Sequence, residues 1–329
     1  MKKLLFVSLA LLQSVFFADE NFYSTKEINS SRFLDWETRE KFSALDFVSL
    51  GDDIFSKSFI IGEGSQTYTA YRTISHFRIN KFETTYKLWY DTKVKAEKLG
   101  YVFQNPGQAG SGGRRGKEPT SENENEPVVM VNWHDAIVWC NALSELHGKK
   151  PCYTYKKKVL RNSTESAICD LAECNWYADG YRLPTESEWE YAARITKNGM
   201  QSGALASGQT ESKKASSVSW TSENAKKTKT VGTAGSILET ESFPSSGNAN
   251  AAGIFDMSGN VLEFCWDWFG NYEVQKAGSI SSGAPFGSER VSRGGSFSLY
   301  TPFIGAGDRY SFDANEAYNY LGFRICTSK

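Results

Sequence analysis

The stretch RVSRGGSFSLYTPFIGAGDRYSFDANEAYNYLGFRICTSK, from Arg290 to Lys329, decides how the chain is interpreted. Its two ends have the pattern of strands: RVSRGGS (290–296) leads into a Gly-Gly pair suited to a tight turn, and LGFRI (321–325) alternates apolar with small or polar residues. The 23 residues from Ser298 to Tyr320 show no hydrophobic period. A segment of that length without regular structure is uncommon in a compact domain unless it is functional. We therefore predict that it is displayed outside the core.

Length and composition indicate a globular protein. The chain has 329 residues, of which 40% are hydrophobic and 23% charged, and its formal net charge is -1. This balance argues against nucleic acid as a partner, because a protein that binds phosphate backbones presents a strongly basic face. Aromatic residues make up 14% of the chain, which is typical of folds that pack large rings and of surfaces built to bind.

Residues 1–18, MKKLLFVSLALLQSVFFA, have the organisation of a secretory signal peptide. Lys2 and Lys3 precede an apolar run, and the small residue Ala18 precedes two acidic residues. The alternative is a membrane anchor, but a spanning helix needs roughly 20 apolar residues. We therefore predict export to the periplasm or the cell surface, with no transmembrane span in the mature protein. Residues 19–45 are interpreted as a polar N-terminal lead-in, and residues 46–329 as one domain.

Export permits disulfide bonds, but the spacing of the cysteines does not decide their pairing. Cys152 and Cys174 lie in one polar insertion, where a loop staple between them is one candidate. A structural zinc site needs His or Cys pairs at tighter intervals than this chain has. Six cysteines allow fifteen pairings; they are Cys140, Cys152, Cys169, Cys174, Cys265 and Cys326.

Local signals mark the starts of helices. Asn132 and Asp135 can cap a helix that begins at Trp133, and Thr185 with Glu188 forms a capping box for a short second helix. A further helix is expected from about 83 to 99. Glu186, Glu188 and Glu190 follow one another at the start of the short helix; we interpret them as charges that complement the helix dipole, in preference to a catalytic or metal site.

Four sequence blocks in one order resemble the formylglycine-generating-enzyme family, also called the sulfatase-modifying-factor domain. The blocks are VNWHDAIVWCNALS (131–144), GYRLPTESEWEYAAR (180–194), GIFDMSGNVLEFCWDW (253–268), and RVSRGGSF (290–297) followed by LGFRI (321–325). The likeness runs from about Phe47 to Ile325 and so covers most of the chain. It implies an α+β domain with a C-type-lectin-like fold of the formylglycine-generating-enzyme subtype, in which short strands and helices are joined by much irregular backbone.

The family's enzymes oxidise a substrate cysteine to formylglycine with two cysteines that bind copper, and the resemblance carries these positions to Leu299 and Ile304. Neither side chain can form a thiolate or ligate copper. Leu262 stands where the enzymes have an active-site tryptophan, and the shared Ser296 is explained as a turn hydroxyl. We therefore predict that the chain is not an enzyme and binds no copper. A sulfoxide-synthase relative would need a histidine cluster, which three separated histidines do not supply.

The resemblance also implies a structural calcium site. It carries the ligands to the side chains of Asp256 and Glu263 and to the carbonyls of Gly259 and Val261. Hard oxygen donors around a tight turn suit calcium, which accepts six to eight of them in loose geometry. The alternative is that Asp256 caps a turn and that Glu263 pairs with an arginine. Both interpretations stay open here.

A scaffold of this kind without catalytic residues, and with a long aromatic C-terminal segment, resembles the variable proteins of diversity-generating retroelements, in particular the spirochaete member. That resemblance implies a variable region at about 290–326. It also implies AAY codons randomised to NNY codons, which never encode Lys, Glu, Gln, Met or Trp. These five types account for 69 of the 329 residues, so about five are expected between Ser298 and Tyr320, and Glu316 alone is present.

We predict that residues from about 298 to 320 form a diversified recognition surface for a protein or glycan ligand. Tyrosine offers a large amphipathic surface at low entropic cost, and Ser, Gly and Asp adapt the hydrogen bonding around it. The alternative for each aromatic residue is a place in the core. The alternative functions are an oxidase with a rebuilt site and a calcium-dependent carbohydrate-binding lectin. The predicted contact residues are Ser298, Tyr300, Thr301, Phe303, Gly305, Gly307, Asp308, Tyr310, Asp313, Tyr318 and Tyr320; the predicted scaffold residues are Phe297, Leu299, Arg309, Phe312, Leu321, Phe323 and Arg324.

Overall fold

The computed structural model describes residues 42–51, 58–236, 244–272 and 283–328. The chain divides into two units, Met1–Ser43 and Ala44–Lys329, and the second is described below. The predicted signal peptide and nearly all of the predicted lead-in lie outside the described residues. Among the residues that are described, no helix has the length and apolar character needed to cross a membrane.

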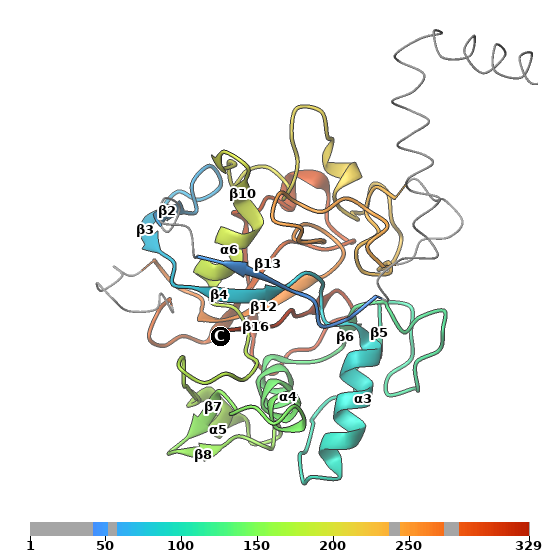
Figure 1. The fold of residues 1–329 in the computed structure, drawn as a ribbon, viewed down its shortest axis with the longest axis vertical. Coiled ribbons are helices and arrows are strands. Elements are labelled where there is room, and N and C mark those ends of the chain that lie inside the picture. Colours follow the sequence, from blue (N-terminus) through green and yellow to red (C-terminus); the bar gives the residue numbers. More distant parts are fainter. Residues whose placement is uncertain (1–41, 52–57, 237–243, 273–282, 329) are drawn as a thin grey trace, which may run out of the picture. The chain divides into compact units, whose positions relative to one another are not determined.

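The second unit consists of short helices and strands joined by irregular backbone, as expected for the α+β class (Figure 1). Its helices are α3 (Tyr86–Glu97), α4 (Trp133–Leu146), α5 (Ser166–Asp170), α6 (Glu186–Arg194) and the 3-10 turns η1 (Ala215–Ser217) and η2 (Thr301–Phe303). The strands of four or more residues are β1 (Phe47–Leu50), β2 (Ser58–Ile61), β3 (Ala70–Thr73), β4 (Phe77–Asn80), β12 (Leu262–Trp268), β13 (Glu289–Arg293) and β14 (Arg309–Asp313). The shorter strands are β5 (Gln108–Ala109), β6 (Val128–Val129), β7 (Tyr153–Tyr155), β8 (Lys158–Val159), β9 (Glu173–Cys174), β10 (Ile195–Thr196), β11 (Gly199–Met200), β15 (Leu321–Gly322) and β16 (Cys326–Thr327).

Two of the predicted helix starts are confirmed, and the helix expected from about 83 begins at Tyr86, after the N-cap Thr85. Asn132 and Asp135 form a reciprocal capping box at α4, and Thr185 and Glu188 form one at α6. Such boxes satisfy backbone N–H groups that a helix start leaves without partners. Helix α4 is buried from its first residue through Ser144 and packs against α3, where Trp89 and Trp139 stack with ring centroids 5.8 Å apart.

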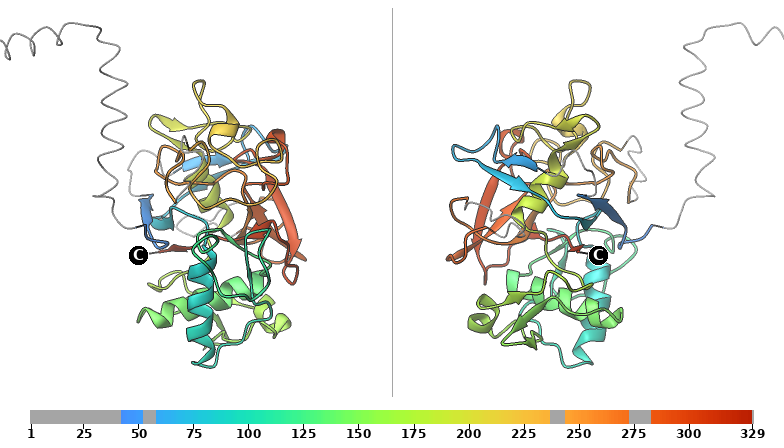
Figure 2. Two further views of the ribbon diagram at one scale, coloured as in Figure 1. Left: turned by 90° about the vertical axis from the view of Figure 1, so that its right-hand side faces the viewer. Right: turned by 60° about the vertical axis from the view of Figure 1, so that its left-hand side comes forward.

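A four-stranded sheet in the order β14-β13-β12-β15 carries the C-terminal segment. Strand β13 pairs antiparallel with both β12 and β14, and β15 lies parallel to β12. A second sheet has the order β1-β4-β16. In both views of Figure 2 the orange-red strands lie along one side of this unit. Among the residues described, β14 pairs with β13 alone and is an edge strand of this sheet.

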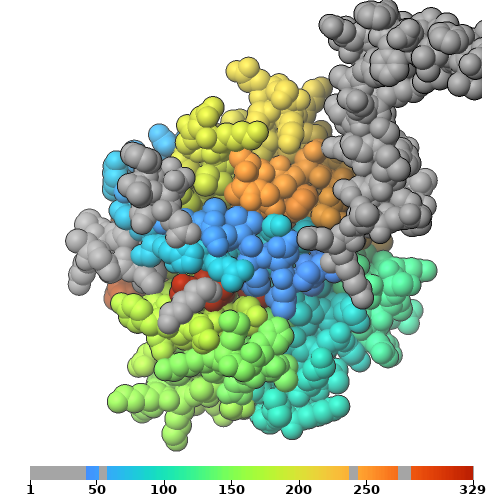
Figure 3. Space-filling view, in the orientation of Figure 1, coloured from blue at the N-terminus to red at the C-terminus, as the bar shows by residue number. Residues whose placement is uncertain are grey.

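Two predictions about the C-terminal stretch need correction. LGFRI does not form one strand, because only Leu321 and Gly322 pair with β12, and the chain then leaves for the second sheet, where β16 pairs with β4. On the face drawn in Figure 3 the last residues appear as a small red area between the blue strands and the green segment. The predicted irregular segment 298–320 also contains regular structure, since β14 pairs with β13 over all five residues.

The six cysteines are free, so the candidate staple between Cys152 and Cys174 is not formed. The pairing of β7 with β9 places Tyr153 directly opposite Cys174. Five of the six thiols are buried, and Cys174 is partly buried. Burial raises the pKa of Cys152 to about 11, so this thiol stays protonated at neutral pH.

Candidate functional site

The backbone of the predicted recognition segment is held to the rest of the unit along its whole length. Its hydrogen bonds reach four different parts of the chain and are spaced a few residues apart. They join Ser222 N to Leu299 O (2.9 Å), Ser258 Oγ to Ile304 O (2.7 Å), Ala306 N to Leu205 O (2.9 Å), Gly307 N to Gly203 O (2.8 Å), Trp133 N to Ala314 O (3.1 Å) and Met130 N to Tyr318 O (3.0 Å). The path of the segment is thus fixed by main-chain atoms and does not depend on most of its side chains.

The side chains of this segment differ widely in exposure. Tyr300 and Phe303 are 61% and 55% exposed, and Ser298 and Asp313 are exposed as well. These four predicted contact residues are accessible to a ligand. Five others are partly buried: Thr301, Asp308, Tyr310, Tyr318 and Tyr320.

Gly305 and Gly307 were predicted as contacts, but both are buried. They lie against Gly203: a Cβ atom added to Gly305 would lie 2.6 Å from the Gly203 carbonyl oxygen, and one added to Gly307 would lie 3.0 Å from the Gly203 Cα. The lack of a side chain therefore lets two backbone segments approach each other. Their burial argues against ligand contact, and we correct their role to close backbone packing.

Three aromatic side chains form a cluster on the later part of the segment. The rings of Tyr318 and Tyr320 stack at 5.1 Å with planes 6° apart, and Phe312 lies 5.5 Å from Tyr318 and 6.2 Å from Tyr320. All three are partly buried and pack against the larger hydrophobic core. Each of these three rings therefore packs against the core with one part and is exposed to solvent with another.

Several polar side chains of the segment are held by local partners. Thr301 donates its hydroxyl to Glu223 Oε2 at 2.8 Å, and the Tyr310 hydroxyl donates to the Phe303 carbonyl at 2.6 Å. Asp308 Oδ2 accepts the Gly305 N–H at 2.8 Å, which closes the turn at this point. Such bonds fix the side-chain orientations that a ligand meets.

The two positions that the resemblance assigns to the catalytic cysteines lie in an apolar cluster. Ile304 is fully buried with Ala206, Ala215 and Val218, and the partly buried Leu299 packs against them. Gly295 adjoins this cluster with φ 71°, and a Cβ atom there would lie 2.6 Å from the Ile304 side chain. The site is filled by hydrocarbon, which offers neither a nucleophile nor a metal ligand.

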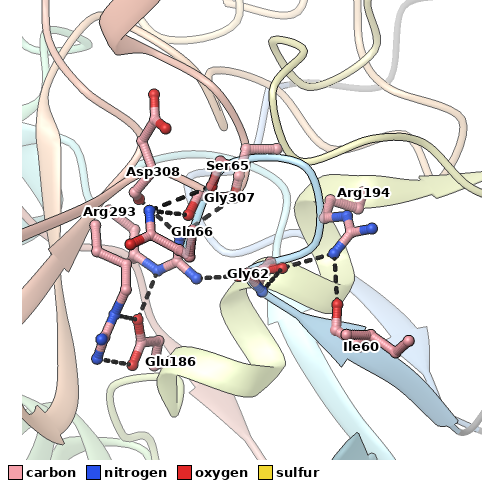
Figure 4. A network of polar contacts seen from close by, with 12 residues as sticks. Ile60, Gly62, Ser65, Gln66, Glu186, Arg194, Arg293, Gly307 and Asp308 are labelled. Carbon is pink, nitrogen blue, oxygen red and sulfur yellow. Dashed lines mark hydrogen bonds and ion pairs between the residues drawn. The ribbon is translucent and has the colours of Figure 1, made fainter. Parts of the chain in front are cut away.

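Beneath the segment lies a network of buried ion pairs (Figure 4). Arg293 of β13 contacts Glu186 at 3.1 Å and also pairs with Glu190, and Arg309 of β14 binds Glu186 through two bonds of 2.6 and 2.9 Å. Glu190 also pairs with Arg194 at 2.7 Å. Glu186 and Glu188 do lie in the first turn of α6, as predicted, and the structure adds that Glu186 and Glu190 are buried partners of arginines.

Asp267 of β12 lies at the end of this network. The Glu186 N–H donates to its Oδ2 at 2.7 Å, whereas its Oδ1 has no hydrogen-bond partner among the residues described. Burial, with the neighbouring Glu186 carboxylate, raises the pKa of Asp267 to about 8. Its carboxyl group is thus a proton-binding group in the neutral range.

The residues of the implied calcium site are arranged as the alternative interpretation expects. Asp256 has φ 55° and accepts the Gly232 N–H, while Glu263 pairs with Arg324 at 2.7 Å. Both oxygens of Glu263 are engaged, since Oε2 also accepts the indole N–H of Trp189 at 2.7 Å. In the described part of the chain no three His, Cys, Asp or Glu side chains gather as a metal site. Asp256 Oδ1 has no hydrogen-bond partner among the residues described, and calcium stays an untested prediction.

A third buried carboxylate in this place was not foreseen from the sequence. Glu83 accepts hydrogen bonds from the Asn260 side chain at 2.6 Å and from the Val261 N–H at 3.1 Å. Burial, with nearby Asp256, raises the pKa of Glu83 well above its usual range, and burial raises that of Asp256 to about 6. No local signal could have identified Glu83, because its partners lie 177 and 178 residues away.

Comparison with known proteins gives consistent matches. The model of the sulfatase-modifying factor enzyme 1-like domain matches residues 53–329. Chaperone protein LppX of Paenibacillus barcinonensis is 32% identical over 270 residues, which cover 78% of this chain and 82% of that protein. The formylglycine-generating enzyme of Bos taurus is 30% identical over 151 residues, which cover 44% of this chain and 36% of that enzyme.

Solved structures agree with these matches. Treponema denticola variable protein 1 superimposes with a TM-score of 0.63 at 26% identity, over 86% of this chain and 95% of that one. CarF gives a TM-score of 0.63 at 24% identity, over 86% and 98% of the two chains, and PvdO from Pseudomonas aeruginosa gives 0.55 at 20%, over 88% and 99%. The resemblance noted in the sequence and the C-type-lectin-like fold of the formylglycine-generating-enzyme subtype are thereby confirmed.

Proposed function

This chain belongs to the sulfatase-modifying factor enzyme 1-like family, and we propose that it uses the family fold as a non-catalytic scaffold that displays a ligand-binding surface. The surface is formed by residues from about 298 to 320. The proposal includes export of the protein through residues 1–18. It also includes diversification of this segment, as the likeness to Treponema denticola variable protein 1 suggests.

The observation that carries the proposal is that the backbone of the segment is fixed while some of its side chains are exposed. Its backbone is anchored by main-chain hydrogen bonds, while side chains such as Tyr300 and Phe303 project into solvent. Because surface substitutions away from packed features change stability by about 0.5 kcal/mol or less, such positions tolerate many residue types. A fixed path with replaceable side chains is what a diversified recognition surface requires.

The apolar cluster supports a non-enzymatic role. Ile304 is buried among alanine and valine side chains, and Leu299 packs beside it, so neither position offers a thiolate for copper. To test this directly, we would measure oxygen consumption by the purified protein with copper and a cysteine-containing sulfatase peptide. No turnover is expected, and formylglycine formation above the peptide-only control would contradict the proposal.

Diversification is tested by sequencing the locus in sibling isolates. Differences are expected to concentrate between Ser298 and Tyr320, at NNY codons, and to fall on exposed positions. Within the same segment the buried residues 304–307 and Ala314 serve as internal controls and are expected to stay constant. An even spread of differences over the whole gene would remove the case for a variable segment.

Export is tested separately, by mass spectrometry of the mature N-terminus of the protein isolated from its native cells. Cleavage near residue 18 and recovery in the periplasmic or cell-surface fraction are expected. An intact Met1 in a cytoplasmic fraction would contradict this part of the proposal and leave the display surface unaffected.

A further inference from the structure

The later half of the displayed segment combines an aromatic cluster with acidic side chains. Tyr318 and Tyr320 stack face to face at 5.1 Å, and Phe312 lies against both rings. All three are partly buried, so the cluster is held in place by the core and still reaches solvent. Aromatic ring faces carry negative electrostatic potential and attract cations.

Glu316 brings a carboxylate to this cluster. It is exposed, and its Oε1 accepts the Tyr318 hydroxyl at 2.8 Å. This hydrogen bond raises the pKa of Tyr318, so the phenol remains a neutral donor at neutral pH. The second oxygen of Glu316 has no hydrogen bond among the residues described, and it is free to accept one from a ligand.

Two further carboxylates face each other at the end of the same strand pair. Glu289 of β13 lies directly opposite Asp313 of β14, and both are exposed. Like charges in directly opposite positions destabilise a sheet. In the described residues neither carboxylate forms an ion pair, since Glu289 accepts only the Ser311 hydroxyl and Asp313 only N–H groups of Asn315. This repulsion would be relieved by a cation from outside the chain.

The segment itself has no basic side chain available to neutralise the exposed carboxylates. Between Ser298 and Tyr320 the charged residues are Asp308, Arg309, Asp313 and Glu316, three acids and one base. Arg309 is committed to Glu186 and lies over the rings of Phe269 and Tyr272, so it is not available to the exposed acids. The exposed charge that this half of the segment itself contributes is therefore negative.

We infer that this half of the surface binds an arginine or lysine side chain of a protein partner, an inference that rests on the proposed display function. A guanidinium group is flat enough to extend the tyrosine stack, and its N–H groups match a carboxylate such as Glu316. A sugar could also stack on tyrosine. A neutral sugar, however, would leave the repulsion between Glu289 and Asp313 unrelieved. A basic protein segment satisfies both features.

The inference is tested with defined peptides and the full mature chain. A fluorescein-labelled peptide with two arginines, Gly-Ser-Arg-Gly-Ser-Arg-Gly-Ser, is titrated with the protein in low salt and followed by fluorescence anisotropy. The same peptide with glutamine in place of arginine is the matched probe. We expect the arginine peptide to bind at least tenfold more tightly and its affinity to fall as salt is raised.

Variants locate the site on the protein. Glu316→Gln preserves shape and removes the charge, and Tyr320→Ala removes one ring of the stack; each is expected to weaken binding of the arginine peptide at least threefold. Tyr177→Ala is the control, since Tyr177 is highly exposed and lies outside the segment. Thermal unfolding of each variant shows whether it is folded. If Tyr320→Ala is unfolded, Glu316→Gln carries the test alone.

Equal binding of the two peptides, or binding of neither, would overturn the inference, as would unchanged binding by a folded Glu316→Gln variant. Binding of a neutral oligosaccharide array in a Tyr320-dependent manner, without binding of the arginine peptide, would assign the surface to glycans instead. The sequencing of sibling isolates does not depend on ligand charge. A failure here with diversification confirmed therefore rejects the basic partner and keeps the display function.

Discussion

The segment 298–320 and the ion-pair network beneath it differ in which atoms hold the structure together. In the segment the backbone is anchored and side chains such as Tyr300 point outward, whereas in the network the side chains of Glu190 and Arg293 are fully buried and hold elements together. Charged side chains are therefore buried in the network, whereas the rings of Tyr300 and Phe303 are exposed in the segment. The difference teaches that buried charge pairs join β13 and β14 to α6, while the segment keeps side chains such as Tyr300 available for contact.

Removing one partner of the buried network gives the largest expected effect. Arg293→Met removes the cation shared by Glu186 and Glu190, which then keep Arg309 and Arg194; because breaking a buried pair costs up to about 3–5 kcal/mol, a loss of up to this size is expected. Denaturant unfolding at neutral pH measures the loss. Lys93→Met is the control, because Lys93 pairs with Glu97 on the surface of α3 and such pairs contribute about 0.5 kcal/mol or less. A loss in Arg293→Met no larger than in this control would refute the structural role of the network.

Two neighbouring residues of the segment, Phe303 and Ile304, are expected to differ in their contribution to stability, because only Ile304 is buried in the apolar cluster. Ile304→Ala leaves a cavity in a buried cluster and is expected to cost about 2–5 kcal/mol, whereas Phe303→Ala removes a side chain that is mostly exposed and is expected to cost about 0.5 kcal/mol or less. Thermal or urea unfolding of the two variants compares them directly. Similar losses in both would mean that the boundary between scaffold and display is misplaced.

The pH dependence of stability tests the raised pKa of Asp267. Because burial raises this pKa to about 8 from an ordinary value of 3.8, the folded protein retains a proton that the unfolded chain has already released. Stability is therefore expected to fall as pH rises between about 4 and 8, by at most about 1.4 kcal/mol per pH unit for this group. Asp267→Asn stays neutral, so its unfolding free energy is expected to fall less between pH 5 and pH 8. Parallel pH profiles for the two proteins would contradict the assignment.

The smallest effect is expected at the most exposed tyrosine of the segment. Tyr300→Ser should change the free energy of unfolding by about 0.5 kcal/mol or less, because the ring is 61% exposed and the backbone there is held by main-chain bonds. Differential scanning calorimetry checks this. A marked loss of stability would show that Tyr300 is a structural residue and would narrow the surface available for variation.

Local signals predicted the elements that depend on neighbours in sequence. The capping boxes at Asn132 and Thr185 identified α4 and α6 because the bonding atoms lie three residues apart. Strand β14 was not predicted, because its sequence RYSFD carries no local strand signal and becomes a strand by pairing with β13. The single strand predicted at LGFRI was wrong for the same reason: Leu321 and Gly322 pair with β12, and the chain then continues to β16, which pairs with β4 in another sheet.

The candidate site was predicted unevenly. Tyr300 and Phe303 are exposed as expected, whereas Gly305 and Gly307 are buried against Gly203, about a hundred residues earlier in the chain. The partners of the α6 glutamates also lie far away, Arg293 at 103 residues from Glu190 and Arg309 at 123 from Glu186. Spacing along the chain carries no information about such contacts.

From the residues alone it was possible to establish the family resemblance and two of the helix starts, and that resemblance implies that Leu299 and Ile304 stand in place of two thiols. The folded arrangement was needed to show that these two residues pack in one apolar cluster, that the α6 glutamates are buried with arginines, and that Tyr318 and Tyr320 stack beside Glu316. The physical reason is the separation along the chain of the groups that interact: helix caps join residues only a few positions apart. Burial and charge pairing are set by segments that meet only when the chain is folded.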